Sequence, residues 1–382
     1  MNKIAELISR LCPDGVEFKT LDSLVSYVQP GPYIVSSTKY DTHYSTPVLT
    51  AGQSFILGYT NEEEGIYNAS SQKPVIIFDD FTTSFHWVDF DFKVKSSALK
   101  ILKIKDKQEA DFRYIYMAMK TIHFIPTNHM RHWISLYSKF EIPLPPLNIQ
   151  KEIVSILDSF TSLIGKMKQE EEMRKKQMEY YREKLMAPQT NWKIKTLGEI
   201  GTFTRGNGLQ KSDFRVKGFP CVHYGQIHTY YNTCIYKTKS FCEEDLAKKL
   251  QKASYGDLLI ATTSEDVKAC CKAAVWFGAG DVAYSGDSFC YSHDQDPKYM
   301  AYLFQTEMFA KQKQKAATGA KVIRVSGESM ASFSFAFPPL VQQRQIASIL
   351  DSFETYISKL EKTIELRQKQ YEYYREKLLT FE

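Results

Sequence analysis

Apolar residues recur at alternating spacings of four and three along two long segments of the chain. In the first segment these positions are Ile153, Leu157, Phe160, Ile164, Met167, Met178, Tyr181 and Leu185. In the second they are Ile346, Leu350, Phe353, Ile357, Leu360, Ile364, Tyr371, Tyr374 and Leu378. This spacing is the heptad seam of a coiled coil. We therefore predict two long helices that pair antiparallel through their apolar seams.

The two segments are copies of each other, aligned without a gap at a constant offset of 193 residues. Both open on a Pro-Pro pair, and both contain the runs ILDSF and YYREKL. Proline suits the first turn of a helix because that turn has no use for the missing N–H. The pattern predicts helices from about Asn148 to Met186 and from about Val341 to Phe381. A helix of about 38 residues is about 57 Å long, which is more than a small globular domain needs.

Arg174 and Arg367 occupy the same seam position in the two copies. A polar residue in a seam can fix the register of a coiled coil at some cost in stability. The alternative is a solvated arginine whose aliphatic stem covers the seam. The sequence leaves both interpretations open.

Short β-type runs fill the segment from Phe18 to Leu144, where glycines and polar turns separate them. We expect strands in FKTLDSLVSYV, TPVLTAGQSFILGYT, KPVIIFDDFTTSF, VDFDFKVKSSALKILKI and FEIPLPPL, and a helix in DFRYIYMAMKTI. The segment from Trp192 to Pro338 repeats this order, and Arg324 aligns with Arg131 when both are counted back from the Pro-Pro pairs.

The resulting prediction is an α+β protein with two pseudo-repeated α/β domains separated by two long antiparallel coiled-coil helices. The expected boundaries are residues 1–144 and 190–337 for the two domains, and 145–189 and 338–382 for the helices. The N-terminal run AELISRLCPDG lies where a helix end lies before the second domain. We expect it to stand in for a missing helix and to close the pseudo-repeat into a ring.

Composition adds a mild positive charge and a cytoplasmic location. The net charge is +5, and the two helical segments are nearly neutral, so the excess lies in the globular parts, as suits an acidic partner such as DNA. No apolar run is long enough to cross a bilayer, and the N-terminus is not of the signal-peptide type. The seven cysteines form no C-x-x-C pair and are expected to be reduced thiols without a bound metal.

The doubled ILDSF and YYREKL helices, the PLPPL and FPPL runs before them, and two unequal α/β domains resemble the specificity subunit of a type I restriction-modification system. The resemblance covers essentially the whole chain. It implies two target-recognition domains, each reading one half of a split site in double-stranded DNA. It also implies that the long helices act as a ruler and as the docking surface for two methyltransferase subunits, and that restriction translocase-nuclease subunits join this core.

The residues themselves predict a chain without catalytic activity or cofactor. An adenine methyltransferase needs an Asn/Asp-Pro-Pro-aromatic run, whereas leucine or phenylalanine flanks both Pro-Pro pairs here. Gly206-Asn207-Gly208 lacks the third glycine of a cofactor turn, and there is no P-loop. A coiled-coil scaffold that holds two protein-binding or glycan-binding domains, without touching DNA, is the alternative function.

The candidate DNA contacts are polar loop residues at matching places in the two domains. Thr50 and Gln53 match His223 and Gln226, but all four could equally be turn residues that bond their own backbone. Carboxylates can accept a hydrogen bond from cytosine, and hydroxyls can reach either base. On that ground we add Asp79, Asp80, Thr82 and Thr83 in the first domain, and Thr262, Thr263 and Ser264 in the second.

The strongest candidate stretch precedes the last strand of each domain. From Lys311 to Arg324 it contains Thr318 and five basic residues, Lys311, Lys313, Lys315, Lys321 and Arg324, and no acidic residue. Its counterpart contains His123, Asn128, His129, Arg131, His132 and Trp133. Such a surface suits phosphate, and either arginine could form a bidentate pair with guanine. A solvated helix face is the alternative for Lys311 to Lys315.

Two Tyr-Arg pairs on the helices are candidates for partner docking. Tyr180 and Tyr373 face away from the seam, and Arg182 and Arg375 are close to them. Tyrosine and arginine are favoured anchors of protein interfaces. Packing against the chain's own domains is the alternative.

Overall fold

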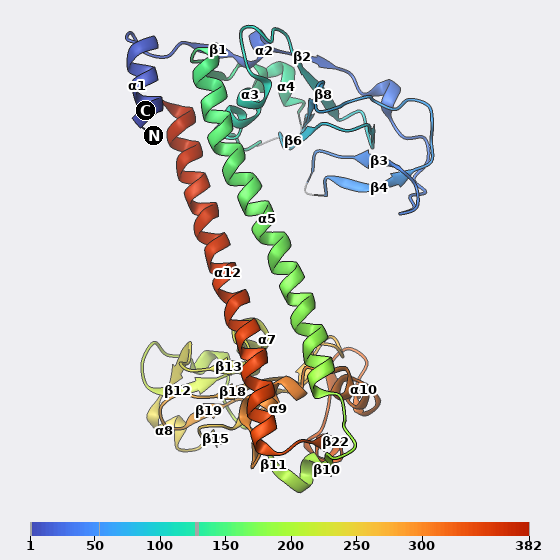
Figure 1. The fold of residues 1–382 in the computed structure, drawn as a ribbon, viewed down its shortest axis with the longest axis vertical. Coiled ribbons are helices and arrows are strands. Elements are labelled where there is room, and N and C mark those ends of the chain that lie inside the picture. The colour runs from blue at the N-terminus through green and yellow to red at the C-terminus, as the bar shows by residue number, and fades with distance from the viewer. Residues whose placement is uncertain (1, 53, 127–129, 382) are drawn as a thin grey trace. The chain divides into compact units, whose positions relative to one another are not determined.

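The computed structural model describes residues 2–52, 54–126 and 130–381. The chain divides into two units, one formed by Met1–Lys168 with Lys362–Glu382 and the other by Gln169–Glu361. Each unit combines a mixed α and β domain with parts of both long helices (Figure 1). No helix in the described part of the chain is long and apolar enough to cross a membrane.

The first domain is built around β5 (Val75–Asp79), whose first four residues are fully apolar and buried. It lies inside a four-stranded antiparallel sheet of order β2-β8-β5-β6. The other strands of this sheet are β2 (Val25–Val28), β8 (Leu99–Ile104) and β6 (Phe85–Val88). A three-stranded sheet contains β4 (Ile56–Thr60), β3 (Thr46–Leu49) and β7 (Lys93–Val94), and a two-stranded sheet pairs β1 (Phe18–Thr20) with β9 (Glu141–Pro143).

The run FKTLDSLVSYV is not one strand, contrary to the sequence prediction. A four-residue helix, α2 (Leu21–Leu24), separates β1 from β2. Leu21 and Leu24 are three residues apart, so one helical turn buries both side chains, which an extended strand could not do on one face. The expected helix is present as α3 (Phe112–Met119). The remaining short helices are η1 (Gly31–Tyr33), α4 (His132–Ser135) and η2 (Tyr137–Lys139).

The second domain repeats this plan around β16 (Leu258–Ala261), which is buried throughout. Its five-stranded sheet is β11 (Gly201–Arg205), β20 (Ser288–His293), β16, β18 (Lys272–Trp276) and β13 (Cys234–Ile235). A four-stranded sheet is β14 (Ser240–Cys242), β12 (Phe219–Val222), β19 (Val282–Tyr284) and β15 (Lys252–Ala253). Two-stranded pairs are β10 (Lys193–Thr196) with β22 (Ser334–Phe337), and β17 (Thr263–Ser264) with β21 (Ile323–Arg324).

Short helices connect these strands. They are α6 (Leu197–Ile200), η3 (Lys211–Asp213), α7 (Tyr224–Thr229), α8 (Glu244–Ala247), α9 (Pro297–Leu303), α10 (Glu307–Ala316) and α11 (Gly327–Ala331). The second-domain counterpart of the helix predicted in DFRYIYMAMKTI is α9, which follows its N-cap Asp296 as α3 follows Asp111. Both domains therefore have a central buried strand and, after the sheet, a helix capped by aspartate, whereas α7, α8 and α10 are additions of the second domain among the described residues.

The long helices are α5 (Leu147–Met186) and α12 (Leu340–Thr380), so both begin and end within one residue of the predicted positions. In the first unit the start of α5 packs against the end of α12, where Phe160 and Tyr374 have ring centroids 5.5 Å apart. In the second unit the end of α5 packs against the start of α12, where Tyr181 and Phe353 are also 5.5 Å apart. The helices are thus antiparallel within each unit, as predicted, and the repeat offset relates the two aromatic pairs.

The N-terminal helix α1 (Asn2–Leu11) lies beside the last turns of α12 (Figure 1). Leu7 and Ile8 pack on the core of the first unit only in part. Leu378 and Leu379 of α12 are buried there, and Leu379 is the repeat equivalent of the buried Met186 in the second unit. The end of α12 itself therefore takes the place that we expected α1 to fill, and α1 adds to it.

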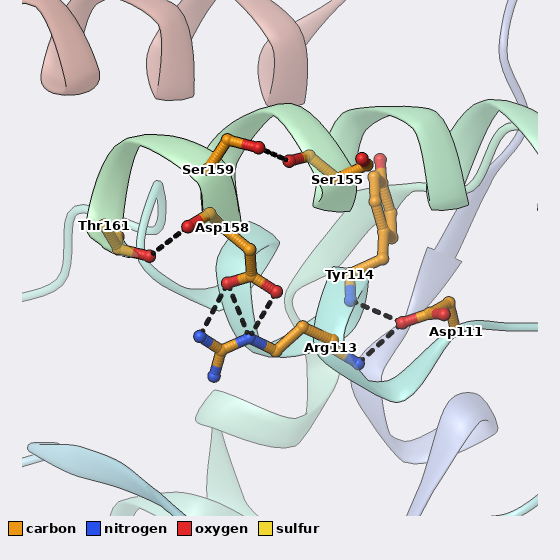
Figure 2. A network of polar contacts seen from close by, with 7 residues as sticks. All are labelled: Asp111, Arg113, Tyr114, Ser155, Asp158, Ser159 and Thr161. Carbon is orange, nitrogen blue, oxygen red and sulfur yellow. Dashed lines mark hydrogen bonds and ion pairs between the residues drawn. The ribbon is translucent and has the colours of Figure 1, made fainter. Parts of the chain in front are cut away.

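A polar joint fixes the first domain on α5 (Figure 2). Arg113 on α3 donates to Asp158 through Nε at 3.1 Å and through an η nitrogen at 2.8 Å, while its guanidinium lies 4.9 Å from the Trp87 ring centroid. Asp111 accepts the amide hydrogens of Arg113 and Tyr114 and so caps α3. These contacts hold the domain at a set place along the helix.

The second domain uses the same joint with Lys298 and Asp351, which form an ion pair. In both joints a buried glutamine on the long helix completes the contact. Gln150 accepts the amide of Asp111 and donates to the Pro145 carbonyl, and Gln343 does the same for Asp296 and Pro338. The glutamines Gln150 and Gln343 are identical in the two copies, as are Asp158 and Asp351. The heptad seam alone does not explain this identity, whereas the shared joint does.

The two seam arginines have different surroundings. Both donate to a glutamine three residues later. The guanidinium of Arg174 also lies 5.4 Å from the Tyr356 ring centroid on α12, in the second unit. Arg367 is exposed. Of the two, Arg174 contacts the facing helix, and its role in fixing the register stays a prediction.

Candidate nucleic-acid interface

Arg131 and Arg324 occupy equivalent places, each next to the end of a central buried strand. The residue after Arg131 donates its amide to the carbonyl of Asp80, just beyond β5, at 2.8 Å. The residue after Arg324 donates to the carbonyl of Thr262, just beyond β16, at 3.4 Å. Both arginine side chains are exposed. The alignment made from the sequence therefore holds in the backbone, and it presents a guanidinium at the same point of both domains.

A small ribbon, formed by β17 and β21, carries Arg324 in the second domain. Thr263 pairs with Arg324 across this ribbon, and Thr318 exchanges two backbone hydrogen bonds with Arg324, at 2.8 and 2.9 Å. Gly319 makes the turn at φ +99°, where a side chain would meet the Val322 carbonyl oxygen at 2.1 Å. The loop is therefore closed on itself, and it leaves Thr318, Lys321 and Arg324 exposed.

The turn after β5 takes the corresponding place in the first domain. Asp79 accepts the amide hydrogens of Phe81 and Thr82 at 2.9 and 2.8 Å, so its carboxylate builds the turn. Thr83 has φ +58° and is buried. Thr82 is exposed, and its hydroxyl contacts Ser84. Of these residues, Thr82 is the one placed to contact an outside partner.

Asp80 is a buried structural residue, so the prediction that it faces DNA is wrong. Its side chain is 1% exposed and forms an ion pair at 3.2 Å with Lys100, which is 0% exposed. The carboxylate also accepts the amide of Trp133 at 2.9 Å. The buried lysine explains the acidic residue, since a charge can stay in a core when it is paired and hydrogen-bonded.

Other predicted contacts on this stretch also lie inside the domain. His132 and Trp133 are buried, and the His132 ring lies 5.4 Å from that of Phe124. Gln53, Asn128 and His129 lie outside the described residues. Thr50 accepts the amide of Gly52 at 3.2 Å, which is the turn role left open by the sequence.

The matching second-domain residues are occupied in the same way. His223 caps α7 by accepting the Gly225 amide at 3.2 Å, and its own amide donates to Gln226. Gln226 also donates to the Ser240 hydroxyl at 2.7 Å. Burial, with the nearby Lys211 charge, lowers the pKa of His223, so the ring is held neutral as a cap. The turn interpretation therefore applies to this pair.

Thr262 and Thr263 are buried against Asp287. The Thr262 amide donates to the Asp287 carbonyl, and the Thr263 hydroxyl donates to the Asp287 carboxylate at 3.2 Å. Ser264 is half-buried and accepts the amide of Asp266. The two threonines thus fix the base of the ribbon. Sequence analysis did not identify Asp287 as the partner of these threonines, or Lys100 as the partner of Asp80, because each lies about 20 residues away along the chain.

The basic stretch is not uniformly a surface. Lys313 is buried, and its ammonium donates to the carbonyls of Lys268 and Cys270, both at 2.8 Å. Its predicted contact with phosphate is therefore wrong, because α10 turns this residue towards the core. Lys311 and Lys315 are exposed on the same helix.

Of the four candidates for partner docking, the two tyrosines are exposed and the two arginines are half-buried. Tyr180 and Tyr373 are 59% and 57% exposed, at repeat-equivalent places. Arg182 packs on its own domain instead, donating to Gln305 at 3.3 Å. Arg375 is half-buried, and its guanidinium lies 5.9 Å from the Tyr371 ring centroid. The tyrosines remain available to a partner, and the arginines follow the packing alternative.

Nothing in the described residues resembles a catalytic metal centre. No group of three or more His, Cys, Asp and Glu side chains in residues 2–52, 54–126 and 130–381 could hold a metal ion. All seven cysteines are free. Thr318 and Lys321 are exposed near Arg324, and a hydroxyl and a lysine suit hydrogen bonding and phosphate contact.

The comparisons with known proteins all indicate the same family. Residues 13–173 and 189–368 each match the type I restriction modification DNA specificity domain. A type I restriction enzyme specificity subunit of Escherichia coli is 35% identical, covering 96% of this chain and 95% of that protein. A putative type I restriction enzyme specificity subunit of Haemophilus influenzae is 28% identical, covering 96% of each.

The crystal structure of a type I restriction-modification S subunit from M. genitalium has the same fold. Its TM-score is 0.61 at 16% identity, covering 95% of this chain and 96% of that one. These comparisons give no support to the scaffold alternative. With two matched specificity domains in tandem and a full-length relative at 35% identity, the chain belongs to the family of type I restriction-modification specificity subunits.

Proposed function

We propose that this chain reads a split site in double-stranded DNA, one half through each domain, in the cytoplasm. It directs two methyltransferase subunits and the restriction translocase-nuclease subunits to that site. The observation that supports this most is the equivalent placement of two exposed arginines, Arg131 and Arg324, beside the ends of the central strands. An arginine can form a bidentate pair with guanine O6 and N7 in the major groove.

The neighbouring groups fit the same role. Lys321 suits phosphate, which fixes the register of a protein on the duplex without carrying sequence information. Thr82 in the first domain and Thr318 in the second offer hydroxyls that can reach either base. Tyr180 and Tyr373 suit docking of two copies of one partner, because their exposure and repeat positions match.

The chain itself leaves methyl transfer and cleavage to its partners in this proposal. Its sequence holds no run for a methyl donor, a nucleotide or a flipped adenine. Purified alone and supplied with labelled methyl donor and DNA, the chain should transfer no methyl group. Transfer by the single chain would contradict this part of the proposal.

The test of split-site reading is a domain exchange. The chain is expressed with its methyltransferase subunits, and the methylated positions of the host DNA are sequenced. Replacing Phe18 to Leu144 with the same region of a relative should change one half of the methylated site and leave the other intact. The reciprocal exchange of residues 193–337 is the matched control, and alteration of both halves by either exchange would contradict separate reading.

A further inference from the structure

Two adjacent thiols lie directly behind the ribbon that carries Arg324. Cys270 and Cys271 are both 1% exposed, and their Sγ atoms are 3.9 Å apart. Cys271 has φ +62°, a left-handed backbone conformation that non-glycine residues rarely adopt. The exposed residues Lys268 and Ala269 precede the pair. DNA reading, as proposed above, makes no use of these thiols.

A buried lysine lies beside the pair. The Lys313 ammonium donates to the carbonyls of Lys268 and Cys270, both at 2.8 Å. Burial lowers the pKa of Lys313. The hydrogen bond from Cys271, together with the Lys313 charge, lowers the pKa of Cys270, while the same bond and burial raise that of Cys271. Cys270 therefore forms a thiolate more readily than Cys271, which stays protonated.

The pair is also joined to the ribbon by hydrogen bonds. The Cys270 thiol donates to the Thr262 carbonyl at 3.1 Å and lies 4.0 Å from the Ile323 carbonyl. The Cys271 amide donates to the Ala261 carbonyl at 2.8 Å. The Thr262 carbonyl is the same acceptor that fixes the residue after Arg324. A change at Cys270 therefore reaches the arginine through one shared atom.

We propose that Cys270 and Cys271 form an oxidation site, at which a peroxide converts the pair into a disulfide and loosens the ribbon that presents Arg324. This inference rests on the proposed function of that ribbon in DNA reading. It concerns the second domain alone, because Cys12 is the only cysteine before residue 221.

The chemistry balances with hydrogen peroxide as the oxidant. The Cys270 thiolate attacks one peroxide oxygen, the O–O bond breaks, and the leaving hydroxide takes a proton to become water. The sulfur of Cys271 then displaces the hydroxyl of the resulting sulfenic acid, which leaves as a second water. Two thiols are oxidised, and one peroxide is reduced to two waters.

Closing the bond changes the local geometry. The Sγ atoms must approach from 3.9 Å to about 2.05 Å. The Cys270 thiol hydrogen is lost, so the Thr262 carbonyl loses one of its two donors. Both effects act at the base of the β17–β21 ribbon.

The experiment uses the full chain with its methyltransferase subunits, treated with hydrogen peroxide and then with a thiol-blocking reagent. Trypsin releases residues 269–272 as one peptide holding both cysteines, and its mass reports whether they are blocked or joined. DNA binding is measured on the methylated target and on two targets, each altered in one half. Oxidation should join the thiols and reduce discrimination at the half read by the second domain by about 5- to 150-fold, the range of one bidentate base contact. Dithiothreitol should restore it.

Two serine variants and one control decide the assignment. Cys270→Ser keeps a hydroxyl donor for Thr262, so it should bind DNA as the reduced protein does and ignore peroxide. Cys271→Ser should also ignore peroxide, and it keeps the test open if the first variant folds poorly. Cys234→Ser removes a more exposed thiol of the same unit and should remain sensitive.

Three results separate the possible failures. Unjoined thiols in residues 269–272 after peroxide treatment would overturn the oxidation site. A disulfide that leaves discrimination at both halves unchanged would overturn the coupling to the ribbon. A reduced complex that does not distinguish its target from altered DNA would instead contradict the proposed function, whatever the state of the cysteines.

Discussion

Asp80→Asn should destabilise the first domain and leave its sequence preference unchanged. Asp80 and Lys100 are almost fully buried and form an ion pair at 3.2 Å. The substitution keeps an oxygen that can accept the Trp133 amide, so the change is mainly the loss of the negative charge. Lys100 is then left as an unpaired charge in the core.

The expected loss is about 3 kcal/mol of unfolding free energy. Breaking a buried pair by removing one partner costs about 3–5 kcal/mol. The lower end applies because Lys100 also donates to Gln29 and its ammonium lies 5.3 Å from the Tyr27 ring centroid. Since about 1.4 kcal/mol is a factor of ten, amides protected by unfolding of the domain should exchange about two orders of magnitude faster.

The assay is amide hydrogen exchange of the full chain, read by mass spectrometry of peptides. Peptides from β5 and β8 should lose protection, while those from β16 and β20 of the second domain serve as an internal reference. Asp79→Asn is the matched control, because its carboxylate lies in a turn and an asparagine oxygen can still accept both amides. Adding Lys100→Met to Asp80→Asn should recover stability to within about 1 kcal/mol of the original.

The result that refutes this reasoning is specific. If Asp80→Asn leaves exchange in β5 and β8 unchanged but alters the methylated site, the carboxylate contacts a base and the ion pair contributes little.

Three further outcomes are expected. Arg324→Ala should weaken binding by about 1–3 kcal/mol and relax specificity in one half of the site; a uniform loss with a shallower salt dependence would place the arginine on phosphate. A double-mutant cycle of Phe160→Ala and Tyr374→Ala, followed by denaturant unfolding, should give a coupling of about 0.5–1.5 kcal/mol, and additive losses would show that the rings do not interact. Burial lowers the pKa of His223 below its unfolded value, so the unfolded chain binds the proton more tightly and the stability of α7 should fall as pH drops below about 6.5. Hydrogen exchange of Tyr224–Thr229 measures this, and His223→Asn, which can still cap, should remove the pH dependence.

Local periodicity predicted the long helices to within one residue, because Pro-Pro starts and heptad spacing are properties of neighbouring positions. The antiparallel pairing also followed from the duplicated seam. The strands around β5 and β16 followed from apolar runs of strand length. The division of the first run into β1, α2 and β2 was not predicted. Over four residues, the three-residue spacing of apolar positions in a helix differs little from the alternation of apolar and polar positions in a strand.

Individual site residues were harder to predict because a loop side chain can satisfy either the backbone or a partner. Asp80 was predicted to contact a base, whereas the pairing of β5 with β8 places Lys100 next to its carboxylate. Lys313 looked like a phosphate contact, although its helix turns it inward. The equivalent placement of Arg131 and Arg324 could be predicted because the repeat fixes it without any knowledge of side-chain contacts, and their contact with DNA stays a prediction.

The division of the chain determines the order in which the protein is completed during synthesis. The second unit is contiguous from Gln169 to Glu361, whereas the first needs both Met1–Lys168 and Lys362–Glu382. Leu378 and Leu379 complete the core that Ile149 and neighbouring residues of α5 begin. At about 5–20 residues per second, the ribosome adds the missing helix roughly 10–40 s after Lys168. The domain made first is therefore finished last, and its open apolar face is exposed to chaperones and proteases throughout that interval.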